Sequence, residues 1–256
     1  MIDPALSLGV GAAVAAGLAV GGCAYAAMWP ASRIFGGALT ASRKPGELAL
    51  TFDDGPNPAW TPRLLDELAS HGIKATFFLL GSRAESEPEL VRRIAAAGHT
   101  IGNHSWSHPN LALAKGDRVL HELMRTSALI EDLVGAPVRF FRPPFGARRP
   151  AVLRIARQLG MRPVLWNAMT SDWSGMPAEQ IAERLSSRIE RLERRGWAAN
   201  VVLHDGGHKE PAADREASVK AAGLLAERYK QTHRFVTLDA WSGDLIAIPA
   251  HPGFPP

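Results

Sequence analysis

Two adjacent aspartates and a closely spaced pair of histidines are the residues whose types and spacing most directly suggest chemistry. His104 and His108 lie four residues apart in His-Ser-Trp-Ser-His, so a single turn can aim both imidazoles at one metal ion. A carboxylate from Asp53 or Asp54 would complete a three-ligand set that leaves positions open for water and substrate, as in catalytic zinc sites. The donor types suit zinc, and other divalent transition metals also fit them.

Each of these signals has a simpler alternative when it is taken alone. The histidine pair is equally compatible with two surface side chains, and Asp-Asp-Gly-Pro is turn-prone by itself. Together they favour a metal site in which the two aspartates have different roles. If one carboxylate binds the ion, its neighbour is free to accept a proton from water.

Further polar clusters follow predicted strands in the same way. They are Arg142-Pro143-Pro144, Asp172-Trp173 and His204-Asp205. In a parallel barrel the loops that follow the strands converge on one face, and active sites are built there. Segments that are far apart in the chain can therefore meet at one point.

Short apolar runs alternate with amphipathic helical segments along most of the chain. The predicted strands are residues 48–52, 75–80, 100–101, 139–141, 163–166, 200–203 and 235–238. The predicted helices are residues 62–71, 88–97, 117–134, 150–159, 178–195 and 214–230. This alternation predicts an α/β fold with a parallel sheet, and about seven such units predict a barrel. No second domain is predicted.

The composition is that of a globular protein with one sizeable core. The chain has 256 residues, of which 46% are hydrophobic and 21% charged. A net charge of +4 is too small a surplus to argue for nucleic acid as a partner. The single cysteine, Cys23, excludes an intramolecular disulfide and a cysteine-based metal site.

The N-terminal segment differs from the rest. No charged residue occurs from Ala5 to Trp29, a stretch long enough to cross a bilayer as a helix. We expect residues 1–45 to form a hydrophobic anchor and linker, with a cleaved signal peptide as the alternative, although a basic start is missing. Residues 46–240 are then the catalytic domain, on the cell-envelope side of the membrane or secreted after cleavage, and residues 241–256 an irregular tail.

Five motifs occur in order along the chain. They are Thr51-Phe52-Asp53-Asp54-Gly55-Pro56, His104-Ser105-Trp106-Ser107-His108, Arg142-Pro143-Pro144-Phe145-Gly146, Asp172-Trp173 and Leu203-His204-Asp205. In combination they resemble the polysaccharide deacetylase family (carbohydrate esterase family 4, the NodB-homology domain), from about Glu47 to Leu238. The resemblance implies a distorted, incomplete (β/α) barrel. It also implies a metal-dependent hydrolase that removes N-acetyl groups from N-acetylhexosamine residues of a polysaccharide, such as peptidoglycan or a chitin-like polymer.

The same resemblance implies a role for each matching residue. It gives a general base, a general acid, a base-orienting arginine and three ligands of one divalent metal, most often zinc: Asp53, His204, Arg142, and Asp54 with His104 and His108. The oxyanion or substrate is expected to contact Phe145, through its backbone N–H, with Pro143 and Trp173 nearby.

One position departs from the family pattern. An aspartate that orients the acid histidine usually stands three residues before Asp172, and here that residue is Met169. Methionine cannot accept a strong hydrogen bond from imidazole, so His204 is expected to be a weaker acid–base group. Asp172 is a possible substitute, although its implied role is structural.

The remaining histidines have no partner in the motifs. We expect structural or solvated side chains at His71, His99, His121, His208 and His233. His208 and Asp214 are candidates for the rim of the site, and Trp106, like Trp173, fits either sugar stacking or core packing. Two other functions fit the sequence: deacylation of a lipid-linked amino sugar, and glycan binding by a membrane protein that has lost catalysis.

Overall fold

The computed structural model describes residues 21–22, 25, 27–28, 32 and 34–244. Its strands are β1 (Glu47–Gly55), β2 (Thr76–Leu79), β3 (Thr100–Asn103), β4 (Phe140–Phe141), β5 (Arg162–Pro163), β6 (Ala168–Met169), β7 (Ala199–His204) and β8 (Arg234–Phe235). Its helices are α2 (Thr61–Ser70), α3 (Gly81–Ser86), α4 (Pro88–Ala96), α5 (Gly116–Val134), α6 (Pro150–Gln158), α7 (Ala178–Glu193) and α8 (Glu216–Tyr229), with 3₁₀ turns η1 (Pro144–Gly146) and η2 (Leu238–Asp244).

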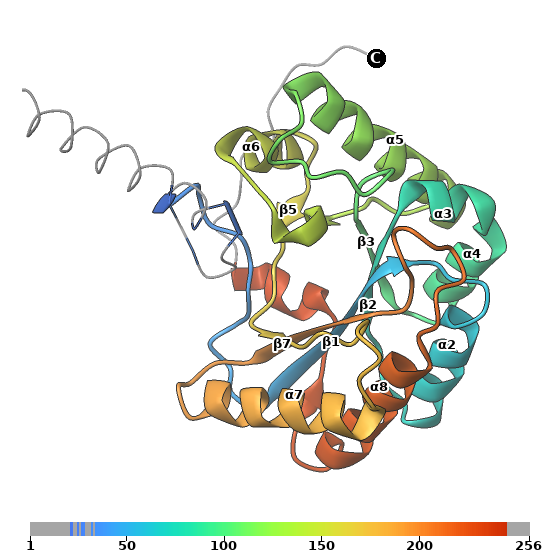
Figure 1. Cartoon of the computed structure of the whole chain (residues 1–256), viewed down its shortest axis with the longest axis vertical. Helices are drawn as coiled ribbons and strands as arrows, with labels where there is room; N and C mark the ends of the chain where they lie inside the picture. The colour runs from blue at the N-terminus through green and yellow to red at the C-terminus, as the bar shows by residue number, and fades with distance from the viewer. Residues whose placement is uncertain (1–20, 23–24, 26, 29–31, 33, 245–256) are drawn as a thin grey trace, which may run out of the picture.

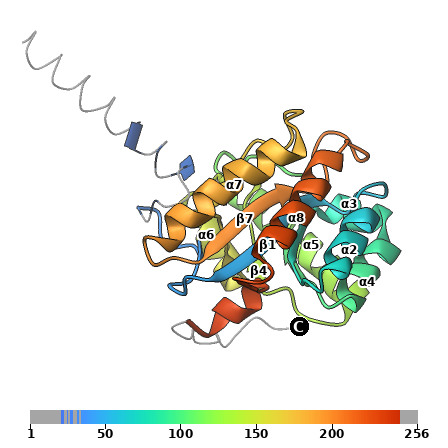
Figure 2. The same cartoon turned by 90° about the horizontal axis from the view of Figure 1, so that it is seen from below.

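All the strands belong to one parallel sheet. Seven of them run in the order β5-β4-β3-β2-β1-β7-β6, and β8 pairs with the start of β1. Within the described residues the end strands β5 and β6 are not paired with each other, so the curled sheet stays open. The helices form an arc around its outside, and α7 and α8 cover β7 and β1 (Figures 1 and 2). The predicted α/β fold, a distorted and incomplete barrel, is confirmed.

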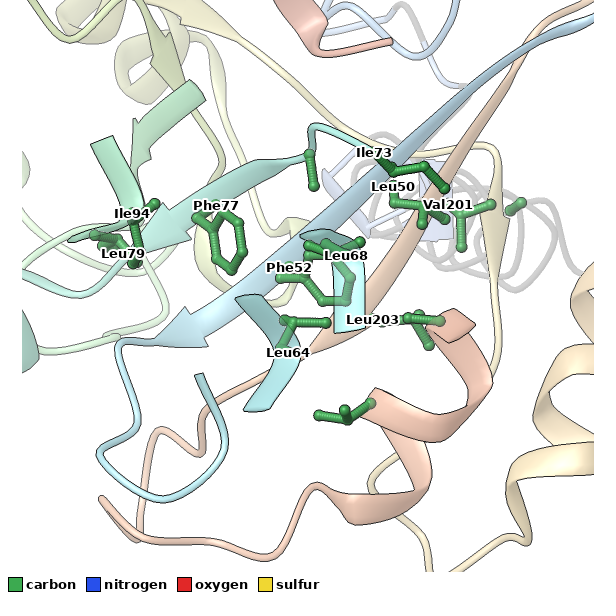
Figure 3. Close-up of a cluster of buried hydrophobic side chains, with 14 of the residues drawn as sticks. Leu50, Phe52, Leu64, Leu68, Ile73, Phe77, Leu79, Ile94, Val201 and Leu203 are labelled. Atoms are coloured by element: carbon green, nitrogen blue, oxygen red, sulfur yellow. The ribbon is translucent and has the colours of Figure 1, made fainter. Parts of the chain in front are cut away.

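Alternation along the strands separates the core from the site. In β1, Leu48, Leu50 and Phe52 point to the helices, so Thr51 and Asp53 point to the inside of the curled sheet. Figure 3 shows Leu50 and Phe52 beside Leu64 and Leu68 of α2 and Val201 and Leu203 of β7. The same alternation in β7 leaves His204 on the inner side. The sheet therefore carries its chemistry on one face and its main apolar core on the other.

The long helices lie close to their predicted bounds because each has a clear apolar face and clear ends. In α7, Ile181, Leu185 and Ile189 are buried at helical spacing. Gly135, with φ 68°, ends α5 in the left-handed conformation that glycine adopts without strain. The two-residue strand β6 and the six-residue helix α3 are not among the predicted elements.

The packed part of the chain reaches beyond the predicted limits of residues 46 and 240. Leu39 is buried and bridges Val164, so the apolar run at 163–166 pairs partly with residue 39 instead of continuing β5. Trp241 is fully buried, and its indole N–H donates to Glu47. Most of the predicted anchor and residues 245–256 lie outside the described residues. Among the described residues, no helix is long and apolar enough to cross a membrane.

Candidate active site

Asp53 lies on the inner face of β1, near the carboxyl end of the strand, and is held by a buried arginine. Arg142 Nη1 donates to Asp53 Oδ1 at 2.7 Å and to Thr51 Oγ1 at 2.8 Å. The guanidinium is fully buried and lies 4.1 Å from the centre of the Phe78 ring. A buried ion pair of this kind fixes the direction of the carboxylate, because removing either partner would leave a charge without compensation.

Asp54, His104 and His108 converge on one point. Asp54 Oδ1 lies 3.4 Å from His104 Nε2 and 3.2 Å from His108 Nε2. One ligand atom from each of the three residues lies within 4.8 Å of the others. The Oδ1 atom is buried and has no hydrogen-bond partner in the described part of the chain. A buried carboxylate oxygen beside two imidazole nitrogens fits a divalent metal ion.

The protonation of the two imidazoles also fits a metal. His104 Nδ1 lies 2.8 Å from the carbonyl oxygen of Arg142, which can only accept, so Nδ1 has the proton and the Nε2 lone pair is free. Burial is the largest cause that lowers the pKa of His108 to about 3, against the opposing effect of Asp54. Burial also opposes the ionisation of Asp54, but His104 and His208 outweigh it and hold the pKa of Asp54 well below its usual range.

A buried glutamate shapes the loop that presents both histidines. Glu122 of α5 accepts the backbone N–H groups of Trp106 and Ser107 at 2.9 and 2.8 Å. At the start of the same loop, Asn103 Oδ1 accepts the N–H of Ser105 at 2.7 Å. These bonds replace strand pairing where the chain leaves β3. Glu122 therefore fixes the conformation of the loop from α5.

Backbone strain is concentrated here. Among the described residues, the non-glycine residues with positive φ are Asp54 (71°), Ser105 (70°), His108 (56°) and Phe145 (59°). Asp54 lies near the carboxyl end of β1, and the other three follow β3 or β4 at the same end of the sheet. Such conformations persist only where the surroundings enforce them, and they cluster at functional sites.

His204 is at the end of β7, directly beside Asp53 in the neighbouring strand. Its Nδ1 lies 2.9 Å from Asp172 Oδ1, and its backbone N–H donates to Asp172 Oδ2 at 2.8 Å. Burial would lower the pKa of His204, but the charge and hydrogen bond of Asp172 outweigh it and raise that pKa to about 9. The imidazole is therefore protonated at neutral pH and can act as a proton donor through Nε2.

Asp205 packs against the end of β1, next to the adjacent aspartates. The Thr61 hydroxyl donates to Asp205 Oδ2, and a Cβ on Gly55 would lie only 2.4 Å from that oxygen. Burial raises the pKa of Asp205 to about 7, with the Thr61 bond opposing it. Only glycine fits at position 55, so the turn after β1 can pack directly on the β7 loop.

These groups open into one cavity of about 580 Å³. Its wall includes Asp53, Asp54, His104, His108 and His204, together with Met169 of β6. Aromatic, charged and imidazole side chains also line it: Phe145, Trp166, Trp173, His208, Lys209, Glu210, Asp214 and Arg215. Phe145 and Trp173 are about half exposed, and Trp173 packs edge-on against His204 with ring centres 4.9 Å apart. Apolar rings around a few convergent polar groups are typical of a binding site for a small group or a sugar.

The comparisons with known proteins agree with this geometry. Residues 40–164 match the family model described as polysaccharide deacetylase. A peptidoglycan-N-acetylglucosamine deacetylase of Bacillus cereus is 38% identical over 193 residues, which cover 75% of this chain and 66% of that protein. A chitooligosaccharide deacetylase of Azorhizobium caulinodans is 32% identical over 198 residues, covering 77% of this chain and 91% of the relative. The chain belongs to the polysaccharide deacetylase family.

The fold of the family is shared as well. The crystal structure of the Bc1960 peptidoglycan N-acetylglucosamine deacetylase superposes with a TM-score of 0.71 and 36% identity, covering 79% of this chain and 91% of that one. The chain spans about two thirds of the first B. cereus relative and 40% of a related Listeria monocytogenes deacetylase. The family resemblance predicted from the five motifs is therefore confirmed.

Of the two expectations for the partner of His204, the geometry favours the substitute, Asp172. Met169 lies in β6 and lines the cavity, but Asp172 takes the position beside His204 with both carboxylate oxygens. The loop between β6 and α7 turns so that residue 172, and not residue 169, faces the end of β7. Ser218 of α8 donates to Asp172 Oδ2 at 2.7 Å and holds the carboxylate in place.

Some of the other predicted positions line this cavity and others do not. Asp214 and His208 line it as expected of rim residues, but His208 is not without a partner, because its Nδ1 lies 3.6 Å from Asp54 Oδ2. Pro143 is buried outside the lining, and its carbonyl accepts the N–H of Gly146 at 2.9 Å. Trp106 packs under the Arg125 guanidinium, 3.4 Å from the ring centre, and does not line the cavity.

Proposed function

We propose that this protein is a metal-dependent carbohydrate N-deacetylase that hydrolyses the N-acetyl groups of N-acetylhexosamine residues in a glycan. The observation that supports this most is the placement of a carboxylate base and a protonated imidazole on neighbouring strands, beside a three-ligand metal site. Asp53 and His204 are register partners of β1 and β7. Both face the cavity that contains Asp54, His104 and His108.

The ion would be held by Asp54 Oδ1, His104 Nε2 and His108 Nε2, and zinc is the ion we propose. Three nitrogen and oxygen donors with open positions are typical of catalytic zinc. A bound ion would supply polarisation of the amide carbonyl and acidification of the attacking water.

Asp53 is the proposed general base. Its Oδ1 is occupied by Arg142 Nη1, so Oδ2 is the oxygen available for a proton. That atom lies 3.9 Å from His104 Nε2, on the side of the metal ligands. Asp53 Oδ2 accepts the proton from water as the water oxygen attacks the amide carbon, and Arg142 keeps the carboxylate directed toward that point.

His204 is the proposed general acid. Its Nδ1 is bound to Asp172, so Nε2 delivers a proton to the amide nitrogen as the C–N bond breaks, releasing acetate and a free amine. The backbone N–H of Phe145 is the proposed donor to the oxyanion, and each such donor is typically worth about 3 kcal/mol. Trp173, beside His204, would stack on the sugar ring.

A substrate panel tests the proposal and separates its alternatives. Acetate release is measured from chito-oligomers, peptidoglycan fragments and a lipid-linked N-acetylated sugar, with Asp53→Asn as the matched inactive variant. We expect zinc-dependent release from at least one polymeric substrate, with none from the variant. Release from the lipid-linked sugar alone would instead support that substrate. Glycan binding without acetate release from any of them would contradict the enzyme assignment.

We also propose that residues 5–29 attach the protein to a membrane, with the domain on the cell-envelope side. The support is the uncharged length of this segment in the sequence. Fractionation of cells expressing the full chain or a chain lacking residues 1–33 tests it. Equal recovery of both forms in the membrane-free fraction would contradict the proposal.

A further inference from the structure

His208 is one of the polar side chains of the cavity to which the proposed mechanism gives no task. It lies on the loop between β7 and α8, with its side chain 35% exposed. Its Nδ1 faces Asp54 Oδ2 at 3.6 Å, just beyond hydrogen-bond range. Asp54 thus directs Oδ1 to the two ligand imidazoles and Oδ2 to His208.

The loop holds His208 in this place through its backbone. Arg215 Nε donates to the carbonyl of Gly206 at 2.7 Å, and Arg83 Nη2 donates to that of Gly207 at 3.3 Å. A Cβ on Gly206 would lie only 2.1 Å from the carbonyl oxygen of Asp54. The chain therefore reaches His208 by passing directly against the backbone of a metal ligand, where only glycine fits.

Ring geometry excludes His208 as a fourth ligand in this arrangement. Its ring lies nearly parallel to that of His108, with centres 4.4 Å apart and an interplanar angle of 19°. An imidazole binds an ion with a lone pair in the plane of its ring. Two stacked, nearly parallel rings cannot both place one ion in their planes, so His108 binds and His208 does not.

We infer that His208 is a positioning residue for the metal site: its Nδ1–H donates to Asp54 Oδ2 and keeps Asp54 a one-oxygen ligand through Oδ1. A carboxylate held in this way leaves the remaining positions on the ion open for water and substrate. Groups that hydrogen-bond to metal ligands typically contribute about 10- to 100-fold in affinity. This inference rests on the proposed metal site.

Three substitutions separate the donor from the ring. His208→Ala removes both, His208→Phe keeps a stacking ring without a donor, and His208→Asn keeps an N–H near the position of Nδ1 without the ring. His121→Ala, on the exposed side of α5, is the matched control. The zinc dissociation constant is measured for each by competition with a fluorescent chelator, and the melting temperature of each metal-free protein is recorded.

We expect His208→Ala and His208→Phe to weaken zinc binding about 10- to 100-fold, and His208→Asn and His121→Ala to stay within about threefold of the wild type. All metal-free forms should melt within about 2 °C of one another, because His208 is on a loop outside the core. Wild-type affinity in His208→Phe, or a loss in His208→Asn equal to that in His208→Ala, would overturn the inference. If wild-type protein bound no zinc, the proposed metal site itself would fail, which is a separate result.

Discussion

His108 and His204 line the same cavity, yet their surroundings leave His108 neutral and His204 positively charged at neutral pH. His108 shares the single carboxylate of Asp54 with His104 and lies among other histidines, and its pKa is about 3. His204 has Asp172 to itself, and its pKa is about 9. These charges fit the proposed roles, a neutral metal ligand for His108 and a proton donor for His204.

In this comparison the protonation of each imidazole follows from whether it has a carboxylate partner of its own. Burial alone lowers the pKa of both rings. Only His204, whose ring has a charged partner of its own in Asp172, overcomes that effect. Asp172 also accepts the backbone N–H of His204 at the end of β7. Titratable groups whose environments separate their pKa values in this way mark acid and base functions in an active site.

The largest effect is expected from removing the neutral imidazole. His108→Ala deletes one of three ligands, so zinc affinity should fall by at least about 100-fold and turnover by about 10⁴-fold or more. Metal content by mass spectrometry and acetate release together check this. His121→Ala serves as the control, and a His108→Ala protein that kept both zinc and activity would break the comparison.

Removing the protonated imidazole should separate activity from metal binding. His204→Ala is expected to lower kcat by about 10²- to 10⁴-fold, because the leaving nitrogen loses its proton donor. Zinc should still bind with wild-type affinity, since His204 is not a ligand. A variant that lost its zinc would show instead that the two imidazoles belong to one set.

Changing the partner of His204 should move the pH profile. His204 acts while protonated, so activity is lost as the pH rises through its pKa of about 9. In Asp172→Asn that pKa should fall to the ordinary value of 6.5 or below, and at pH 8 this lowers kcat/KM by about 30-fold. The alkaline limb of kcat/KM against pH measures the shift. An unmoved limb would mean that Asp172 does not set the charge of His204.

The smallest effect is expected from Ser218, which contacts Asp172, the partner of His204. Ser218→Ala removes a single hydrogen bond to Asp172 Oδ2. A bond of this kind contributes about 1 kcal/mol, or about fivefold in rate. We expect kcat/KM at pH 8 to fall by that amount, with a small acidic shift of the alkaline limb. A loss as large as that of Asp172→Asn would indicate that Ser218 has a direct role in the reaction.

The part of the fold and site that could be predicted is the part set by local pattern. Helices α4, α5, α6 and α7 have long apolar faces and glycine or proline near their ends, so their bounds were predictable to within a few residues. The four-residue spacing of His104 and His108 predicted two candidate ligands, and the family resemblance added Asp54. The adjacent aspartates then come at the end of the first strand of a parallel sheet.

The rest depends on loop paths that no short pattern encodes. Asp172 reaches His204 only because the chain turns after the two-residue strand β6, which is too short to give a period. His208 reaches Asp54 only because Gly206 lets the loop pass closely over the backbone of Asp54. Long-range packing decides both contacts, so the sequence offered Asp172 only as a possible partner of His204 and gave no partner for His208.

The most direct test of the central claim is a zinc titration of metal-free protein, with acetate release from an N-acetylated glycan followed at each addition. If Asp54, His104 and His108 bind one ion that the reaction requires, release should rise in proportion to zinc and level off at one equivalent. Asp54→Ala should show no such rise. Undiminished release from the metal-free protein, or an equal response in Asp54→Ala, would contradict the account.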